Sequence, residues 1–295
     1  MTDRAVPNPI VRVAPYRARR SRWKEPSILP GFPLAMGITL TYLGLIVIVP
    51  LTMLMLRPWE LGLDGVIGVL TDERVAAALK LSFGLSFLAA LANAPLGLLI
   101  AWTLTRYRFP GRRLLDALVD LPFALPTAVA GIALTALYAP NGPLGIWAAK
   151  IGLKTAYSPL GIFIALVFIG LPFVVRSIQP VLEDLDHEVE EAAQTLGASD
   201  FQRVWRVVIP AITPAMISGL SLAFARAVGE YGSVIFIAGN LPMKTEIAPL
   251  LIVIKLEQFD YAAASAIGAA MLAVAFGSLI VLNVIQMRFA RKGRV

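Results

Sequence analysis

The chain has 295 residues, of which 58% are hydrophobic and 15% charged, and a formal net charge of +7. Soluble domains are about half apolar and about a quarter charged, so a soluble fold could not cover this much apolar surface with polar groups. We therefore expect lipid to be the solvent for much of the chain. The absence of cysteine excludes disulfides and thiolate chemistry. The single histidine, His187, cannot form a metal site alone and is expected in an exposed loop.

The N-terminal 33 residues are basic and proline-rich, which is typical of a cytoplasmic tail. The first apolar run, Leu34–Leu56, has 23 residues. A signal peptide has an apolar core of only about 7–15 residues. We therefore interpret this run as a retained membrane helix that follows a tail.

A helix needs about 20 apolar residues to cross a bilayer, and six segments meet or approach that length. They are Leu34–Leu56, Leu81–Leu104, Leu118–Tyr138, Leu160–Val175, Ala211–Ala238 and Ala262–Met287. Proline and glycine interrupt the third and fourth segments, at Pro122, Pro126, Gly131, Gly170 and Pro172. Such breaks are tolerated where neighbouring helices or a cavity satisfy the backbone, and they favour helices that line a path. The run Ile247–Ile254, interrupted by Pro249, is too short to cross, and it is expected to be an interfacial or re-entrant piece or to pack against its neighbours. Asn141-Gly142-Pro143 predicts an ordinary turn.

Basic residues predict the orientation. Eighteen of the 26 lysines and arginines fall in the two terminal regions and in the loops after the second and fourth segments. Seven fall in the three opposite loops, and Arg226 lies inside a span. Cytoplasmic loops carry the excess of lysine and arginine, so both termini should be cytoplasmic. The positive charge is thus explained by topology and does not indicate a nucleic-acid partner.

Residues 176–210 are too polar to span and are patterned as two short helices. In an acidic stretch, Val189, Ala192, Ala193 and Leu196 recur at helical spacing. Gly197 should end this helix in a left-handed conformation. Ser199 followed by Gln202 forms a capping-box pattern, which predicts a second helix running to Pro210. The two readings are a solvated charged loop and an element that docks into a partner.

The spacing in this loop resembles a known family. Glu191-Ala192-Ala193, Gly197 four residues after Ala193, and the ending Val207-x-Ile209-Pro210 are similar to the EAA loop of binding-protein-dependent ABC importer permeases. The family pattern ends in Ile-x-Leu-Pro, so Val207 and Ile209 are conservative departures. The resemblance implies that this loop docks into a cytosolic ATPase, with Glu191, Ala192, Ala193, Gly197, Ile209 and Pro210 as coupling residues.

The flanking segments resemble one subfamily, the sulfate/thiosulfate permease subunits of the T type, over roughly residues 30–290. The segments that carry this likeness are 170–176, 183–186, 225–233 and 244–250. It implies an all-α permease paired with a homologous second permease, two copies of a cytosolic ATPase that uses ATP and Mg, and an external binding protein. It also implies alternating access. Molybdate permeases are similar around Arg226 and Glu230, so a molybdate or other oxyanion importer is an alternative.

Arg226 and Glu230 lie one helical turn apart inside the predicted fifth span. A charge near the bilayer centre costs at least about 2.5 kcal/mol, so each needs a partner or a wet cavity. Spacing of four residues lets them pair. Either they form a structural clip, which we favour, or Arg226 faces the path and binds the anion. Asp116 and Asp120 are expected to be ordinary interfacial residues.

Motifs for catalysis are absent from the sequence. It contains no Gly-x-x-x-x-Gly-Lys-Ser/Thr loop and no His-Glu-x-x-His. The chain is therefore expected to be no enzyme by itself and to bind no cofactor or metal. Two rivals from other classes are an ion-coupled secondary transporter and a membrane scaffold. The first should show several intramembrane acids and inverted repeats, and the second would not need proline-broken spans.

Overall fold

The computed structural model describes residues 31–185 and 187–292, and every regular element in these ranges is helical. The predicted tail, residues 1–33, lies almost wholly outside the described residues. The α-helices are α1 (Phe32–Leu43), α2 (Val49–Leu56), α3 (Gly62–Thr71), α4 (Glu73–Arg106), α5 (Arg112–Val119), α6 (Leu121–Ala124), α7 (Thr127–Tyr138), α8 (Pro143–Lys150), α9 (Pro159–Glu183), α10 (His187–Thr195), α11 (Asp200–Arg203), α12 (Ile209–Val228), α13 (Val234–Ile237), α14 (Ala248–Glu257) and α15 (Tyr261–Lys292). Residues 44–48 and 204–208 form π-helical turns, and residues 57–61 form a 3-10 turn.

The chain divides into two units, residues 1–50 and 51–295. In the first unit, α1 buries none of its residues, and Leu34, Ile38 and Leu45 are more than 60% exposed. A helix that is apolar all round and exposed all round is stable only in lipid or against another chain. This agrees with the membrane helix predicted for Leu34–Leu56.

Five helical runs are long and apolar enough to cross a membrane: Phe32–Thr71, Glu73–Arg106, Pro159–Glu183, Asp200–Val228 and Tyr261–Arg288. The bent pair α7 and α8, which meet at 47°, would make a sixth span. The predicted fold class, an all-α membrane protein with about six spans, is thus confirmed. The fourth span continues through Pro172 and Pro180, so it is longer than the predicted Leu160–Val175.

The third predicted span, Leu118–Tyr138, is wrong as one continuous helix. Leu125 has an extended backbone, with ψ 135°, and Pro126 follows with ψ 133°. Proline disfavours the helical region for the residue before it, so the chain leaves the helix at Leu125. The segment is therefore three pieces, α5 with α6 on one side of the break and α7 on the other.

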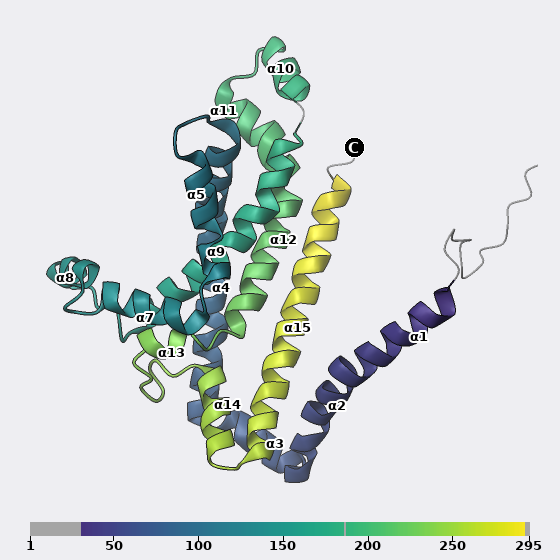
Figure 1. Cartoon of the computed structure of the whole chain (residues 1–295), viewed down its shortest axis with the longest axis vertical. Helices are drawn as coiled ribbons and strands as arrows, with labels where there is room; N and C mark the ends of the chain where they lie inside the picture. Colours follow the sequence, from purple (N-terminus) through teal and green to yellow (C-terminus); the bar gives the residue numbers. More distant parts are fainter. Residues whose placement is uncertain (1–30, 186, 293–295) are drawn as a thin grey trace, which may run out of the picture. The chain divides into compact units, whose positions relative to one another are not determined.

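The fifth predicted span, Ala211–Ala238, is wrong at both ends. The helical run starts eleven residues earlier, at Asp200, and ends at Val228. Gly229 closes α12, and a coil of residues 229–233 separates it from α13. Within the second unit, Figure 1 shows α12 stopping well short of the level reached by α14.

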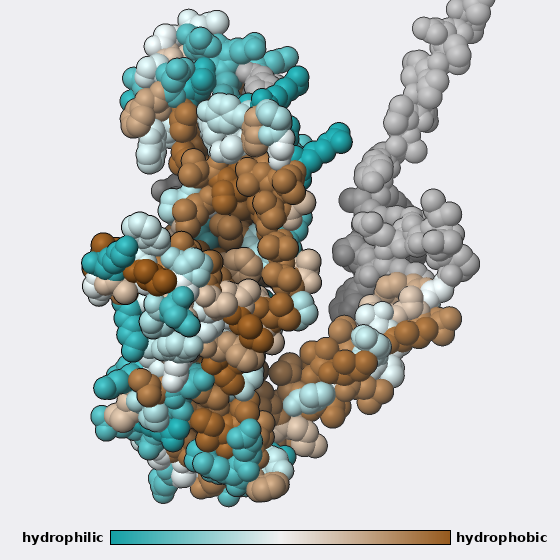
Figure 2. All heavy atoms as spheres, turned by 60° about the vertical axis from the view of Figure 1, so that its left-hand side comes forward, coloured by the Kyte–Doolittle hydropathy of each residue, from teal (hydrophilic) through white to brown (hydrophobic). Residues whose placement is uncertain are grey.

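The core of the second unit forms where α4, α9, α12 and α15 pack together (Figure 1). Val174, Ile178 and Ile212 are fully buried there. Gly97 and Gly219 both lie against Val174, where a Cβ would overlap it. Small residues let membrane helices approach closely, and that packing holds the bundle together in lipid. Figure 2 shows hydrophobic side chains over much of the middle of this unit and hydrophilic ones at the end that carries α10 and α11.

At two further contacts between segments, a glycine lies so close to its neighbour that there is no room for a side chain on it. A Cβ at Gly131 on α7 would overlap the backbone of Ser233, and one at Gly232 would overlap Thr127. The short helix α14 packs against α4 and α15, which confirms that the apolar run Ile247–Ile254 packs against its neighbours. The predicted turn is present at residues 139–142, where the Gly142 N–H donates to the Ala139 carbonyl at 2.7 Å, and Pro143 begins α8.

Candidate functional site

A helical tip, residues 187–203, lies at the end of the second unit where α4, α9 and α15 finish (Figure 1). The first helix of the tip, α10, ends as predicted. Gly197 has φ +86°, and the N–H groups of Gly197 and Ala198 donate to the carbonyls of Gln194 and Ala193 at 2.9 and 3.0 Å. This pair of bonds is the Schellman ending of a helix, which requires a left-handed residue. Gly197 therefore fixes the angle at which the chain leaves α10.

The second helix of the tip starts with the predicted capping box. Ser199 Oγ accepts from the Gln202 N–H at 3.3 Å, and Gln202 Oε1 accepts from the Ser199 N–H at 3.0 Å. The expectation of a separate short helix ending at Pro210 is wrong, because α11, the π turn at 204–208 and α12 form one run to Val228. The tip is thus directly continuous with a spanning helix. Pro210 lies inside this run, directly after the π turn at residues 204–208, and such local π adjustments let a membrane helix continue through proline.

The predicted coupling residues fall in two places. Glu191 and Ala192 are exposed on α10, with Ala193 half-buried and Gly197 exposed beyond it, while Ile209 and Pro210 lie at the start of α12. Large apolar side chains beside the first group are also exposed, namely Leu196 at 89%, Phe201 at 70% and Trp205 at 57%. An exposed apolar patch of this kind is typical of a surface that meets another protein.

Glu190 holds the tip in place, and sequence reasoning missed it. Its carboxylate pairs with Arg106 at the end of α4 and with Arg203 on α11, the latter at 3.5 Å. The Glu190 side chain is only 12% exposed. One buried carboxylate thus joins α10 to two spanning helices, α4 and the run that contains α12. The acidic stretch gave no signal for choosing Glu190, because its partner lies 84 residues away.

Arg226 and Glu230 pair as predicted, with 2.7 Å between Nη1 and Oε2. Glu230 lies in the coil after α12, not inside the span, which corrects its predicted placement. Its side chain is 1% exposed and accepts from the Ser233 N–H and hydroxyl at 2.9 and 3.0 Å, while the Arg226 side chain is 37% exposed. The pair therefore anchors the broken end of α12 to the coil that follows.

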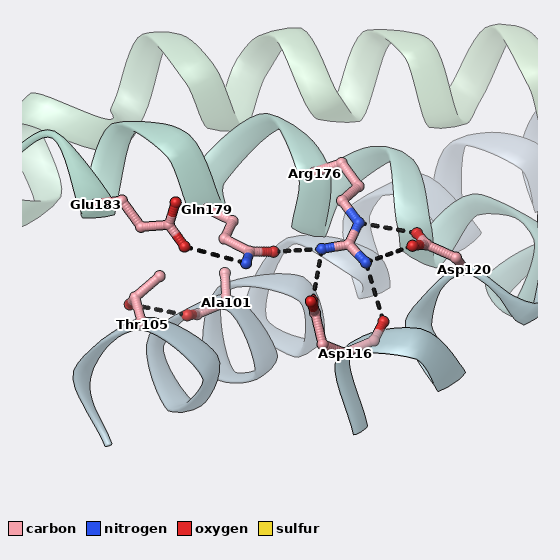
Figure 3. A network of polar contacts seen from close by, with 7 residues as sticks. All are labelled: Ala101, Thr105, Asp116, Asp120, Arg176, Gln179 and Glu183. Carbon is pink, nitrogen blue, oxygen red and sulfur yellow. Dashed lines mark hydrogen bonds and ion pairs between the residues drawn. The ribbon is translucent and has the colours of Figure 1, made fainter. Parts of the chain in front are cut away.

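Arg176 is the centre of a third ion cluster, drawn in Figure 3. Its guanidinium donates to Asp116 Oδ1 at 2.6 Å and to both oxygens of Asp120 at 2.8 and 2.6 Å. It also donates to the Asp116 carbonyl and to Gln179, and Gln179 in turn donates to Glu183. Asp116 and Asp120 are therefore not ordinary interfacial residues. They fasten α5 to α9, just before the break at Leu125.

We expect Arg176→Gln to loosen α5 from α9, because two carboxylates lose their shared partner. The three side chains are 31–47% exposed, so solvent weakens the pairs, and the loss of stability should be about 1–2 kcal/mol. The measurement is thermal denaturation of the purified chain.

The Asp116→Asn/Asp120→Asn variant should lose a similar amount. Adding Arg176→Gln to it should then cost little more, since contacts in one network are not additive. Fully additive losses would contradict a shared network. Arg113→Gln is the control, because Arg113 lies on α5 but forms no ion pair with any residue that the structure describes.

A fourth ion pair joins α4 to the segment before α14. Arg74 donates to both oxygens of Glu246 at 2.7 and 2.6 Å, and the Glu246 side chain is 1% exposed. Next to it, the Ala248 N–H donates to Ser82 on α4 at 2.9 Å. Bidentate pairs of this kind fix geometry as well as contribute energy. They explain why this irregular segment stays packed on the bundle.

The described residues contain no group of three or more histidines, cysteines or acids that could hold a metal ion. His187 begins α10, so it lies on a helix and not in the expected loop, and its side chain is outside the described set. The four ion clusters described above all pair arginine with carboxylates across different segments. Their arrangement fits fastening and transmission between helices rather than catalysis.

The family comparison decides the class of protein. Residues 93–295 match the family described as "Binding-protein-dependent transport system inner membrane component". The chain belongs to this family. The membership decides against the ion-coupled transporter and the scaffold, and it makes the chain a multi-pass component of an inner-membrane transport system. It also supports the view that the chain is no enzyme by itself.

Relatives and solved structures agree with this membership. The chain is 49% identical over 265 residues to the "Sulfate transport system permease protein CysT" of Escherichia coli, covering 90% of this chain and 96% of that protein. It is 47% identical to the protein of the same name from Synechocystis, covering 84% and 87%. Its fold resembles a chain of a bacterial alginate ABC transporter, with a TM-score of 0.72 at 19% identity, covering 87% and 94%. A chain of the MetNI methionine ABC transporter gives a TM-score of 0.52 at 15% identity, covering 74% and 95%.

Proposed function

We propose that this chain is the permease subunit of an ATP-driven importer that carries sulfate and thiosulfate across the inner membrane by alternating access. The observation that carries this proposal is the 49% identity to a sulfate permease protein over 90% of the chain. Because this identity extends over nearly the whole chain, it includes the membrane-spanning helices and is not confined to the tip. The energy would come from a separate ATPase that uses ATP and Mg.

The tip supports a coupling role. Its exposed residues Glu191, Ala192 and Gly197 match the docking loop of the family, and Leu196 and Phe201 offer apolar contact area beside them. Glu190 pairs with Arg106 on α4 and with Arg203 on the run that continues into α12. A displacement of α10 would therefore be transmitted to both α4 and α12. Movement of the ATPase would then act on two spanning helices together, which is what a change between inward and outward access requires.

The orientation proposed is that the tip and both termini face the cytoplasm. The described residues at the tip end of the second unit include the basic residues Arg106, Arg108, Arg203, Arg206 and Arg288. Cytoplasmic surfaces carry this excess. In this orientation the segments around α8 and α14 face outward, where an external binding protein would deliver the anion, and a homologous second permease would complete the path.

The experiment that tests the substrate is complementation. In a bacterial strain without its own sulfate permease subunit but with the other subunits, this chain should restore growth on sulfate and uptake of labelled sulfate. Excess thiosulfate should compete with uptake, and excess molybdate should not. Competition by molybdate alone, or restored molybdate uptake without sulfate uptake, would favour the other oxyanion importer.

A further inference from the structure

A positively charged pocket lies at the turn between α4 and α5. Its volume is about 350 Å³, and it is lined by Arg108, Phe109, Gly111, Arg112 and Arg113. Arg108 and Arg113 are exposed, and Arg112 is half-buried. Among the residues that the structure describes, none of these three arginines has an ion-pair partner. Three like charges therefore share one pocket without a counter-charge from residues 31–185 or 187–292.

The missing counter-charge is a result of how α5 packs. Asp116 stands four residues after Arg112, the spacing at which the two could pair. Its carboxylate instead bonds to Arg176 at 2.6 Å, and Asp120 bonds to Arg176 as well. The first turn of α5 contains no acidic residue. The pocket is thus left with a net positive field that favours an anion from outside the chain.

Apolar side chains that precede and follow the pocket residues in the chain are also exposed. On α5, Leu114 is 67% exposed and Leu118, one turn later, is 50% exposed. Tyr107, before the pocket, is 57% exposed. A short helix with arginines on one side and exposed leucines on the other is typical of the boundary between lipid head groups and acyl chains. Tyrosine is enriched at the same depth.

We propose that this pocket binds the phosphate of an anionic phospholipid, with Arg108, Arg112 and Arg113 around the head group and Leu114 and Leu118 against its acyl chains. The exposed leucines favour a lipid over a soluble anion, because a soluble anion has no acyl chains that could contact them. The proposal does not depend on which substrate the permease carries.

The test is titration of the purified full-length chain in detergent with phosphatidylglycerol or phosphatidylcholine, followed by native mass spectrometry. The parent chain should bind phosphatidylglycerol in preference to phosphatidylcholine. Each arginine near an anionic head group should account for about a fivefold change in affinity. The variant Arg108→Gln/Arg112→Gln/Arg113→Gln should therefore bind phosphatidylglycerol about a hundredfold more weakly, with phosphatidylcholine binding unchanged.

The charge-matched control is Lys150→Gln/Lys154→Gln/Lys244→Gln, which removes three charges from α8 and from loops elsewhere in the chain. It should bind as the parent does. Leu114→Asn/Leu118→Asn should also weaken binding of the lipid, and thermal denaturation checks that each variant is folded. The proposal fails if the arginine variant binds phosphatidylglycerol like the parent, or if the charge-matched control loses as much. Equal binding of glycerol phosphate and of phosphatidylglycerol would overturn the lipid assignment.

Discussion

Replacing Gly197 with aspartate should leave the chain in the membrane but uncouple ATP hydrolysis from sulfate uptake. Gly197 has φ +86°, and a Cβ there would meet nothing within 4 Å. The new side chain would therefore not overlap any neighbouring atom. Its cost is conformational, about 1–2 kcal/mol for a left-handed residue with a side chain, and α10 would relieve it by changing the angle at which it meets α11. Since coupling energies between sites are typically 1–3 kcal/mol, uptake should fall by between about 5-fold and 150-fold.

The readouts are ATPase activity of the assembled complex and uptake in the same vesicles. Gly152→Asp is the matched control, because Gly152 also has a positive φ, +75°, and open surroundings but lies between α8 and α9. Glu191→Lys, on the exposed side of α10, should act like Gly197→Asp. The chain has no cysteine, so a crosslinker at Ala193→Cys would be the single thiol-directed label on this subunit and can report docking. Full uptake by both tip variants would count against the coupling role.

Arg226→Ala alone should abolish uptake, because it leaves the buried Glu230 carboxylate with only Ser233 as a donor. Breaking a buried ion pair by removing one partner costs about 3–5 kcal/mol. The Glu230 side chain is 1% exposed and the Arg226 side chain is 37% exposed, so water that enters the vacated space offsets part of this cost. The expected result is a large drop in thermal stability together with uptake at background.

The variant Arg226→Met/Glu230→Gln separates the two roles of this pair. The amide carbonyl of glutamine still accepts from Ser233, so the coil stays anchored and no charge is left buried. We expect stability and uptake to recover to a large extent, as a structural clip requires. A stable variant with no uptake would instead show that Arg226 contacts the anion. Glu230→Gln alone, which leaves Arg226 charged, is the control.

The sequence predicts those features whose causes are local. The left-handed ending at Gly197 and the capping box of Ser199 and Gln202 depend on a few neighbouring residues, and both are confirmed. The long apolar helices follow from composition. The pairing of Arg226 with Glu230 is also confirmed, although Glu230 lies just beyond the end of the helix on which the spacing argument placed it. Each of these features depends only on residues that lie within one or two helical turns of one another in the sequence.

Features that depend on distant partners could not be read from the sequence. The helix breaks before Pro126 but continues through Pro172 in α9, although both prolines restrict the preceding residue in the same way. Glu190 and Glu191 are neighbours in one acidic stretch. Only the position of Arg106, on another helix, decides which of them pairs and which stays exposed. The same holds for Asp116 and Asp120, whose role appears once α9 brings Arg176 beside them.

The close contacts of Gly131 with the Ser233 backbone and of Gly232 with the Thr127 side chain limit how the second unit can deform. Neither contact leaves room for a Cβ on the glycine, so sliding the segments by one residue would bring a Cβ into the contact. Helix α7 and the coil after α12 must therefore travel as one block. Any movement that opens or closes the path must then occur outside that block. The extended bend at Leu125 and Pro126, directly before α7, is the hinge about which the block can move.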